Sequence, residues 1–242
     1  MKRSLGLLME IDSAKRYKFT ELAKLSKFLE IDFEKILEKY DQASFIETSI
    51  VKGPFFRGLV NGSISDQDSV IVAQKCALSF HKDMRSSINY AIELCIAWLL
   101  EDLILEKLKT LGATIDLDGS DQGRDFLSKY SISVHPDFIF KGQSKSIAVE
   151  LVTSWDDYWI KNDVLDLRSS KYEKLINTSS ETFVLAIDVL RREGMFLSAA
   201  EIRSNSVKRV NPAWGNKLVY SYSGINKNRN SLDVTLHQLL ST

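Results

Sequence analysis

The nine residues Thr182–Leu190, with the sequence TFVLAIDVL, constrain the fold more than any other segment of this chain. Asp188 is the one charged residue among them, and the other residues are almost all apolar. A strand with so little polarity is typical of a sheet centre that is covered on both faces. The segment therefore predicts an α/β protein in which helices flank a β-sheet.

Other segments complete a mixed α/β core, which we place at about residues 84–242. A long helix is predicted from about Met84 to Leu111, because apolar residues recur at helical spacing and Gly112 follows them. The remaining predicted elements are strands at 113–117, 133–140, 146–154 and 217–223, and helices at 164–176 and 234–240.

Residues 1–62 predict a separate, mostly helical N-terminal domain, and residues 63–242 the α/β domain. Two helical segments are followed by residues 45–60, where apolar residues and a Gly-Pro pair predict a hairpin. This order resembles a winged helix-turn-helix, which a polar linker at 62–70 would join to the rest. Residues 32–41, which would hold the recognition helix, carry four acids against two lysines and would repel phosphates. DNA recognition and a packing or dimerisation role both stay open for this segment.

The overall composition is that of a soluble globular protein. The 242 residues include 32 Lys and Arg against 32 Asp and Glu, and 44% are hydrophobic. Zero net charge excludes a uniformly basic nucleic-acid coat, but it does not exclude a nuclease with local charge. Cys76 and Cys95 lie in apolar helical segments and are expected to be buried thiols. No apolar stretch is long enough for a membrane span, so we expect a cytoplasmic protein with no membrane partner.

Two acids on consecutive predicted strands carry the strongest chemical signal. Asp137 follows Pro136 near the start of one strand, and Glu150 lies on the next strand, beyond a turn at Gly142. Residues placed symmetrically about a turn face each other across the ladder. Two such carboxylates predict an oxygen-rich Mg²⁺ site, because no His or Cys cluster accompanies them. The alternative is that the two are unrelated surface acids at strand ends.

The motif Pro136-Asp137, followed by Glu150-x-Val152, resembles that of the PD-(D/E)xK nuclease superfamily, which includes restriction endonucleases. The resemblance covers about residues 84–190, where the long helix, two strands, a helix and an apolar strand follow in the family's order. It implies Mg²⁺-dependent hydrolysis of DNA phosphodiesters, with Asp137 and Glu150 as metal ligands.

One position departs from that family. Its motif ends in a Lys two residues after the Glu, where this chain has Val152. In some members the Lys comes from the next helix, and here Lys171 is the first candidate and Arg168 the second. The alternative is that both are solvated surface charges. Without a substitute for the Lys, the domain would only bind DNA.

The family also often uses a Glu on the helix before the first core strand. Glu93 is the preferred candidate here, as a catalytic and metal-binding carboxylate, and Glu101 is the alternative. Their spacing rotates them by about 80° around the helix, so both cannot face one metal equally. Asp118 is a further acid, which Asp-Gly turn chemistry explains more simply.

Two more segments bear on nucleic-acid binding. Trp155, Tyr158 and Trp159 predict base stacking, a dimer patch or simple core packing. The segment 202–232 has no acid and a formal charge of +6, with Asn residues interleaved, and such side chains contact phosphates and bases. Its basic residues are the predicted DNA contacts: Arg203, Lys208, Arg209, Lys217, Lys227 and Arg229.

Taken together, these features predict a Mg²⁺-dependent endodeoxyribonuclease that cuts double-stranded DNA, of the type II restriction endonuclease kind. A homodimer is expected, because one site cuts one strand and a two-fold protein matches a palindrome. The alternatives are a non-catalytic DNA-binding regulator with a degenerate nuclease-like domain and a structure-specific nuclease.

Overall fold

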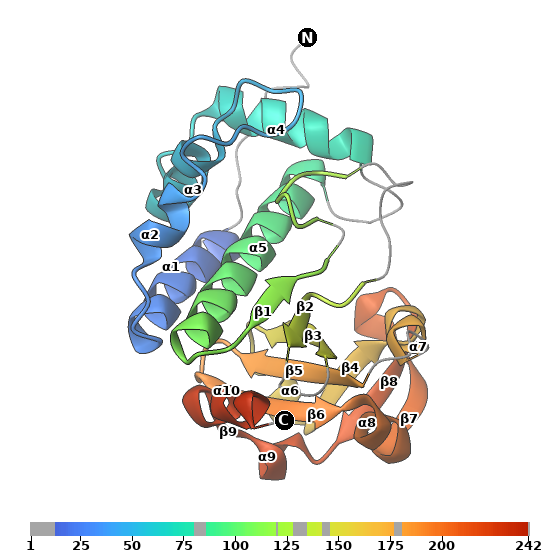
Figure 1. Ribbon diagram of the computed structural model, residues 1–242. Helices are drawn as coiled ribbons and strands as arrows, with labels where there is room; N and C mark the ends of the chain where they lie inside the picture. Colours follow the sequence, from blue (N-terminus) through green and yellow to red (C-terminus); the bar gives the residue numbers. More distant parts are fainter. Residues whose placement is uncertain are drawn as a thin grey trace. The chain divides into compact units, whose positions relative to one another are not determined.

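The computed structural model in Figure 1 describes residues 13–79, 86–119, 121–127, 135–141, 146–176 and 181–241. The chain forms two compact units. The helical unit comprises Met1–Lys107 and Ser120–Ser133, and the sheet unit comprises Leu108–Gly119 and Val134–Thr242. This division differs from the boundary predicted after residue 62, because the long helix belongs to the helical unit for most of its length.

Among the described residues of the helical unit there are five helices, and their buried apolar residues form its core. Asp32 caps the second helix by accepting a hydrogen bond from the Glu34 N–H at 3.0 Å. Cys76 and Cys95 are buried, as expected. The helices are α1 (Ser13–Phe28), α2 (Phe33–Glu38), α3 (Lys52–Asn61), α4 (Asp66–Ser79) and α5 (Ser87–Thr110).

The hairpin predicted at residues 45–60 is wrong, because most of this segment is helix α3. Pro54 lies in the first helical turn, where its missing N–H breaks no hydrogen bond. Phe55, Phe56 and Leu59 then fall on one buried helical face. Without the hairpin, the unit has no wing of the winged helix-turn-helix type in the part of the chain that the structure describes.

The linker predicted at 62–70 is also shorter than expected. Gly62 ends α3 in the left-handed conformation, with φ 69°, and α4 already begins at Asp66. The Ser65 hydroxyl accepts the Asp68 N–H at 3.0 Å, so the serine and aspartate residues of this polar stretch start a helix. The long helix predicted from about 84 to 111 is confirmed as α5 from Ser87, and Met84 lies outside the described residues.

The helical unit contains a charged cluster around a buried arginine. Arg124 is 2% exposed and donates to Asp102 at 2.6 Å and to Glu101 at 2.5 Å, both on α5. Tyr40 donates its hydroxyl to Asp102. Burial and the Asp102 charge raise the pKa of Tyr40, so its hydroxyl keeps its proton. We call these four residues the Arg124 cluster.

The sheet unit contains two sheets. The larger has the strand order β1-β2-β3-β5-β6-β9, and the smaller has the order β4-β8-β7. The strands of the larger sheet are β1 (Ile115–Leu117), β2 (Phe138–Lys141), β3 (Ser146–Ser154), β5 (Thr182–Asp188), β6 (Glu193–Ser198) and β9 (Asn230–Ser231). Those of the smaller sheet are β4 (Val164–Arg168), β7 (Ser206–Asn211) and β8 (Lys217–Ser223). The helices are α6 (Tyr158–Asn162), α7 (Ser169–Ile176), α8 (Ala199–Asn205), α9 (Ile225–Asn228) and α10 (Leu232–Leu240).

The predicted central strand is confirmed as β5. It pairs in parallel with β3 and antiparallel with β6, and all but one of its residues are buried. Helices α8 and α10 contact β6, so the predicted class, a mixed β-sheet core flanked by helices, is confirmed. No described helix has the length and apolarity to cross a membrane.

The helix predicted at 164–176 is wrong in its first part, because Val164–Arg168 is strand β4. Leu165, Asp166 and Leu167 are all buried, and β4 pairs along its whole length with β8. This pairing partner lies far along the chain, so local spacing could not reveal it. The second part, Ser169–Ile176, is helix α7, as predicted.

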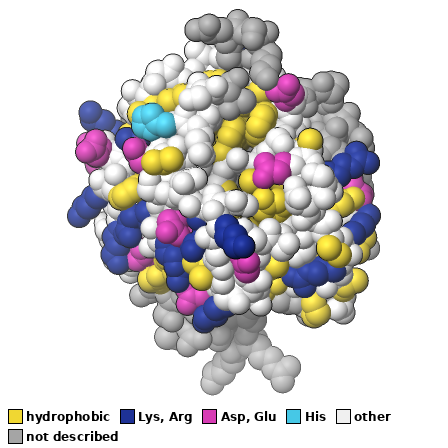
Figure 2. All heavy atoms as spheres, turned by 90° about the horizontal axis from the view of Figure 1, so that it is seen from below, with side chains coloured by type: hydrophobic (Ala, Val, Ile, Leu, Met, Phe, Trp, Pro, Cys, Tyr) yellow, Lys and Arg dark blue, Asp and Glu magenta, His cyan; other side chains and the backbone are white. Residues whose placement is uncertain are grey.

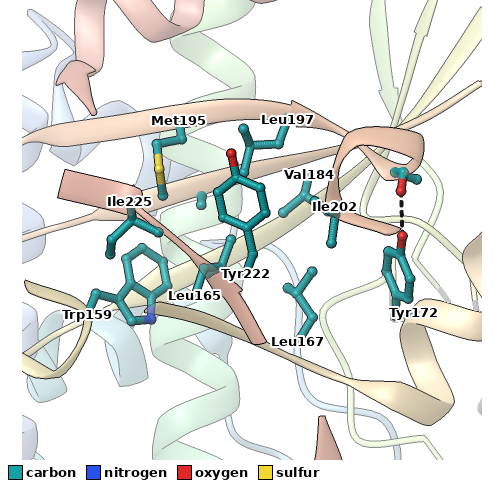
Figure 3. Close-up of a cluster of buried hydrophobic side chains, with 12 residues drawn as sticks. Trp159, Leu165, Leu167, Tyr172, Val184, Met195, Leu197, Ile202, Tyr222 and Ile225 are labelled. Atoms are coloured by element: carbon teal, nitrogen blue, oxygen red, sulfur yellow. Dashed lines mark hydrogen bonds between the residues drawn. The ribbon is translucent and has the colours of Figure 1, made fainter. Parts of the chain in front are cut away.

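An apolar core lies between the two sheets of this unit, as Figure 3 shows. Val184 and Leu197 come from the larger sheet, and Leu165 and Tyr222 come from the smaller one. Tyr172 of α7 closes one end of the core and donates its hydroxyl to the Ala199 carbonyl. The two sheets therefore hold a fixed position relative to each other, which aligns the groups described next.

Candidate active site

The pairing of β2 and β3 brings Asp137 and Glu150 together. Phe138 pairs with Val149, so Asp137 stands opposite Glu150 at the end of the ladder. Asp137 Oδ2 accepts the Leu151 N–H at 2.7 Å, which fixes this carboxylate beside β3 and leaves Oδ1 for other partners. The turn predicted at Gly142 lies outside the described residues.

Glu150 is a buried carboxylate, with 6% of the residue exposed. It pairs in register with Val184 of the central strand β5. Val152, two residues on, has its side chain on the same face as Glu150, because strand side chains alternate. That side chain packs against the core between the two sheets. The position where the family motif has its Lys therefore holds a residue that serves packing.

Lys171 supplies the positive charge from another element. Helix α7 begins directly after β4, and Lys171 lies in its first turn. Its Nζ forms an ion pair with Glu150 Oε1 and lies 3.7 Å from Asp137 Oδ1. Its side chain is 42% exposed, whereas the Glu150 side chain is 7% exposed. The structure thus brings the three predicted residues together, with the ammonium group on the open side.

Helix α7 is fastened to the smaller sheet through Glu173. Its Oε1 accepts from Lys208 at 2.6 Å, from Ser169 at 3.0 Å and from Tyr220 at 3.0 Å. The Lys208 hydrogen bond holds the pKa of Glu173 below its usual value, so the carboxylate stays charged. These contacts fix the helix that positions Lys171.

A cavity of about 270 Å³ opens beside these charges. Glu150 and Val152 of β3 line it together with residues of β4 and α7. Arg168, the second candidate for the missing cation, is exposed and lines the same cavity. The complete lining is Glu150, Leu151, Val152, Thr153, Asp166, Leu167, Arg168, Lys171, Tyr172, Val184 and Trp214.

The donor set at this site suits a hard cation with open coordination positions. Within the described ranges, no group of three or more His, Cys, Asp or Glu side chains could hold a metal ion. Asp137 and Glu150 provide two carboxylates, and Mg²⁺ typically binds through one or two carboxylates while keeping several waters. These two residues therefore fit Mg²⁺ better than zinc, which takes four protein ligands or three with a water.

The other predicted acids have different surroundings. Glu93 lies half-buried on α5 in the helical unit, and its metal-binding role stays a prediction. Glu101 accepts a hydrogen bond from Arg124, so it belongs to a structural cluster. Asp118 Oδ2 lies 3.4 Å from His135 Nδ1 at the surface of the sheet unit. His81 lies outside the described residues.

The six predicted DNA contacts fall into two groups. Lys208, Arg209 and Arg229 form ion pairs with Glu173, Asp166 and Glu193 respectively. Arg203, Lys217 and Lys227 are exposed. On the face drawn in Figure 2, basic side chains are interspersed with acidic and apolar ones. The formal charge of the segment is therefore partly neutralised by acids that lie elsewhere in the sequence.

The aromatic segment after Glu150 is mostly structural. Trp159 is buried in the core between the sheets, and the Tyr158 hydroxyl donates to Asp166 at 3.1 Å. Trp155 donates to the Thr153 hydroxyl at 3.2 Å. Of the three interpretations of this segment, namely base stacking, a dimer patch and core packing, core packing applies to Trp159.

Sequence reasoning missed a buried polar cluster around Asp166. This residue is 1% exposed and accepts from Arg209 at 2.9 Å, Asn211 at 2.7 Å and Tyr158 at 3.1 Å. Trp214 belongs to the basic segment 202–232, but its place in a 3₁₀ turn that lines the cavity was not predicted. A signal existed in the apolar residues on both sides of Asp166, which would have indicated a buried strand.

No family model and no curated protein matches the sequence. Among solved structures, the fold is similar to that of a Holliday junction resolvase from the archaeal hyperthermophile Archaeoglobus fulgidus. The TM-score is 0.37 and the sequence identity is 12%, over 57% of this chain and 97% of the resolvase chain. Similarity at this level carries no argument about function.

Proposed function

We propose that this protein is a metal-dependent nuclease that hydrolyses phosphodiester bonds of DNA. The observation that carries the proposal is the convergence of three side chains: Lys171 of α7 forms an ion pair with Glu150 of β3 and lies 3.7 Å from Asp137, which directly precedes β2. Glu150 and Lys171 also line the cavity. Two carboxylates and one ammonium group are the side chains that metal-assisted phosphodiester hydrolysis requires. The resemblance of Pro136-Asp137 and Glu150-x-Val152 to the PD-(D/E)xK motif supports the same function.

Each residue has a distinct role in this proposal. Asp137 and Glu150 would hold Mg²⁺, which when bound polarises the phosphate and lowers the pKa of a water. Lys171 Nζ donates hydrogen bonds to the attacking water or to a phosphate oxygen, and its charge offsets the negative charge that develops there. The apolar residues around the cavity limit the access of bulk water, so these interactions act at lower dielectric.

The finer proposal is a type II restriction endonuclease that acts on double-stranded DNA as a homodimer. One such site cuts one strand, so two copies related by a two-fold axis would cut both. Arg203, Lys217 and Lys227 remain proposed phosphate contacts, because their charges are exposed. The non-catalytic alternative has less support, because α3 replaces the hairpin of the winged helix and Lys171 stands beside the two carboxylates.

A structure-specific nuclease is a second candidate, and one observation favours it. The cavity beside Glu150 and Lys171 is partly lined by aromatic and apolar side chains, among them Tyr172 and Trp214. A cavity of this kind accepts a base that has left the helical stack. Fully paired duplex substrates would leave it without a nucleotide.

The direct test is plasmid cleavage with Mg²⁺ and with EDTA, using Asp137→Asn and Glu150→Gln. Each substitution keeps the side chain's shape and removes its charge, so cleavage should be lost while the circular dichroism spectrum stays unchanged. Asp116→Asn is the matched control, because Asp116 is an exposed strand acid paired with Lys141. Discrete fragments support the restriction type, and nicked or branched-substrate products support the second candidate. Near wild-type cleavage by either variant would remove these residues from the site.

A further inference from the structure

Trp214 occupies an unusual position for a large aromatic residue. It is 39% exposed and lines the cavity that Glu150 and Lys171 also line. The other described tryptophans are less exposed, with Trp98 and Trp159 fully buried. An exposed indole at a charged cavity offers aromatic surface to a ligand.

The turn that carries this indole is rigidly built. Pro212 begins the 3₁₀ turn and restricts its backbone, and Gly215 closes it in the left-handed conformation with φ 69°. The preceding Asn211 is 1% exposed and donates to Asp166 Oδ2 at 2.7 Å. The buried cluster around Asp166, which has no part in the proposed chemistry, thus anchors the turn to strand β4.

The rest of the cavity has the surfaces that a nucleobase needs. Val152, Leu167 and Val184 give it an apolar wall, and the exposed guanidinium of Arg168 lies at the same cavity. An apolar cavity of roughly 150 Å³ holds a benzene ring. The space of about 270 Å³ here is therefore large enough for a heteroaromatic ring beside the charged groups.

We propose that this cavity receives one unpaired base of the DNA strand being cut, stacked on the indole of Trp214. Bases inside a duplex are covered on both faces by their neighbours, so only a base that has left the stack can enter. Every base has a π-face, so the contact selects for an unpaired nucleotide rather than for a sequence. This inference rests on the proposed nuclease function and specifies its substrate as DNA with an unpaired base at the cleavage site.

The test measures binding without cleavage, in the Asp137→Asn background with Mg²⁺ present. The probes are a fully paired duplex and the same duplex with one unpaired base, followed by fluorescence anisotropy. A 2-aminopurine at the unpaired position reports stacking directly, because stacking quenches its emission. The variants are Trp214→Ala and Trp214→Phe, and the control is Phe28→Ala, an aromatic residue of similar exposure, 41%, on α1.

The expected result is tighter binding of the duplex that contains the unpaired base, with quenching of 2-aminopurine. Trp214→Ala should raise the Kd for that probe about 5- to 100-fold and abolish the quenching, since stacking is lost. The Kd for the paired duplex should not change. Trp214→Phe should retain most of both effects, and Phe28→Ala should retain all of them.

Three results would overturn the inference: no preference for the unpaired base, equal weakening of both probes by Trp214→Ala, or quenching that survives this substitution. Failure of the nuclease function has a different signature. In that case the protein with Asp137 intact cuts neither probe with Mg²⁺, while quenching that depends on Trp214 still reports a base in the cavity.

Discussion

The Arg124 cluster and the site formed by Lys171, Asp137 and Glu150, here called the Lys171 site, are both groups of acids around one cation. They differ in their access to water. Arg124 is 2% exposed and is enclosed by Glu101, Asp102 and Tyr40. Lys171 is 42% exposed beside a Glu150 side chain that is 7% exposed, and a cavity opens there. A closed cluster holds the chain in one conformation, whereas an open one can exchange its partners for a ligand. The same types of side chain therefore form a buried structural cluster in one unit and, in the other, an open site to which we assign the chemistry of the proposed function.

The largest expected effect comes from breaking the closed cluster. Arg124→Met should lower the free energy of unfolding by about 3–5 kcal/mol, because it leaves buried carboxylates without their cation. Urea unfolding followed by circular dichroism measures this change. Arg57→Met is the control, because Arg57 pairs with Glu34 and Asp41 at the surface. If both variants lose equally little stability, burial is not what distinguishes the two clusters.

The second prediction concerns the open site. Lys171→Met should leave the protein folded and should slow cleavage about 100- to 1000-fold, because a positioned, charged hydrogen-bond donor is lost. Single-turnover cleavage with saturating Mg²⁺ measures the chemical step. Arg168→Met separates the two candidates, because Arg168 lines the same cavity from the end of β4. A larger effect at Arg168 would assign the role to that residue.

Moving the positive charge from position 171 to position 152 tests whether its place in the cavity matters. Adding Val152→Lys to Lys171→Met should restore cleavage about tenfold over the single variant, because position 152 lines the cavity from β3. The recovery is expected to be partial, since the Val152 side chain packs against the core. Ser170→Lys in the same background is the control, because it adds an exposed charge to α7 away from the cavity. Equal recovery in both variants would show that net charge alone matters.

The smallest expected effect concerns Tyr172, which follows Lys171 in α7 and lies at one end of the core between the two sheets. Burial raises its pKa from 10.0 to about 12, so the folded state holds the phenol proton more tightly than the unfolded chain does. Its contribution to stability is complete below pH 10 and is lost as the pH rises toward 12. Urea unfolding at pH 9 and pH 11 should show a smaller decline for Tyr172→Phe than for the wild type. A decline of the same size would exclude Tyr172 as the group responsible.

The sequence was sufficient for the parts of the fold that depend on local pattern. The low polarity of Thr182–Leu190 identified the central strand β5, and the symmetry of Asp137 and Glu150 about their turn predicted that they face each other. Lys171 was expected near them, and the structure places it there. Its role in catalysis stays a prediction, as does that of Glu93.

The errors have two physical causes. Strand β4 was predicted as helix because its pairing partner β8 lies more than 50 residues later, and α3 was predicted as a hairpin because Gly53-Pro54 also occurs in turns. In the same way, the acids that neutralise Lys208, Arg209 and Arg229 lie in distant segments. Contacts between distant segments override local preference, and a single sequence does not reveal them.

The position of Lys171 in the chain also affects how such a site can be recognised from sequence. One carboxylate directly precedes β2 and the other belongs to β3, whereas Lys171 comes from α7, after an intervening helix and strand. Insertions or deletions between Thr153 and Val164 would change the spacing of the motif without moving the ammonium group, because β4 and Glu173 hold α7 in place. A site of this kind is therefore defined by its three-dimensional arrangement and not by the linear spacing of its residues.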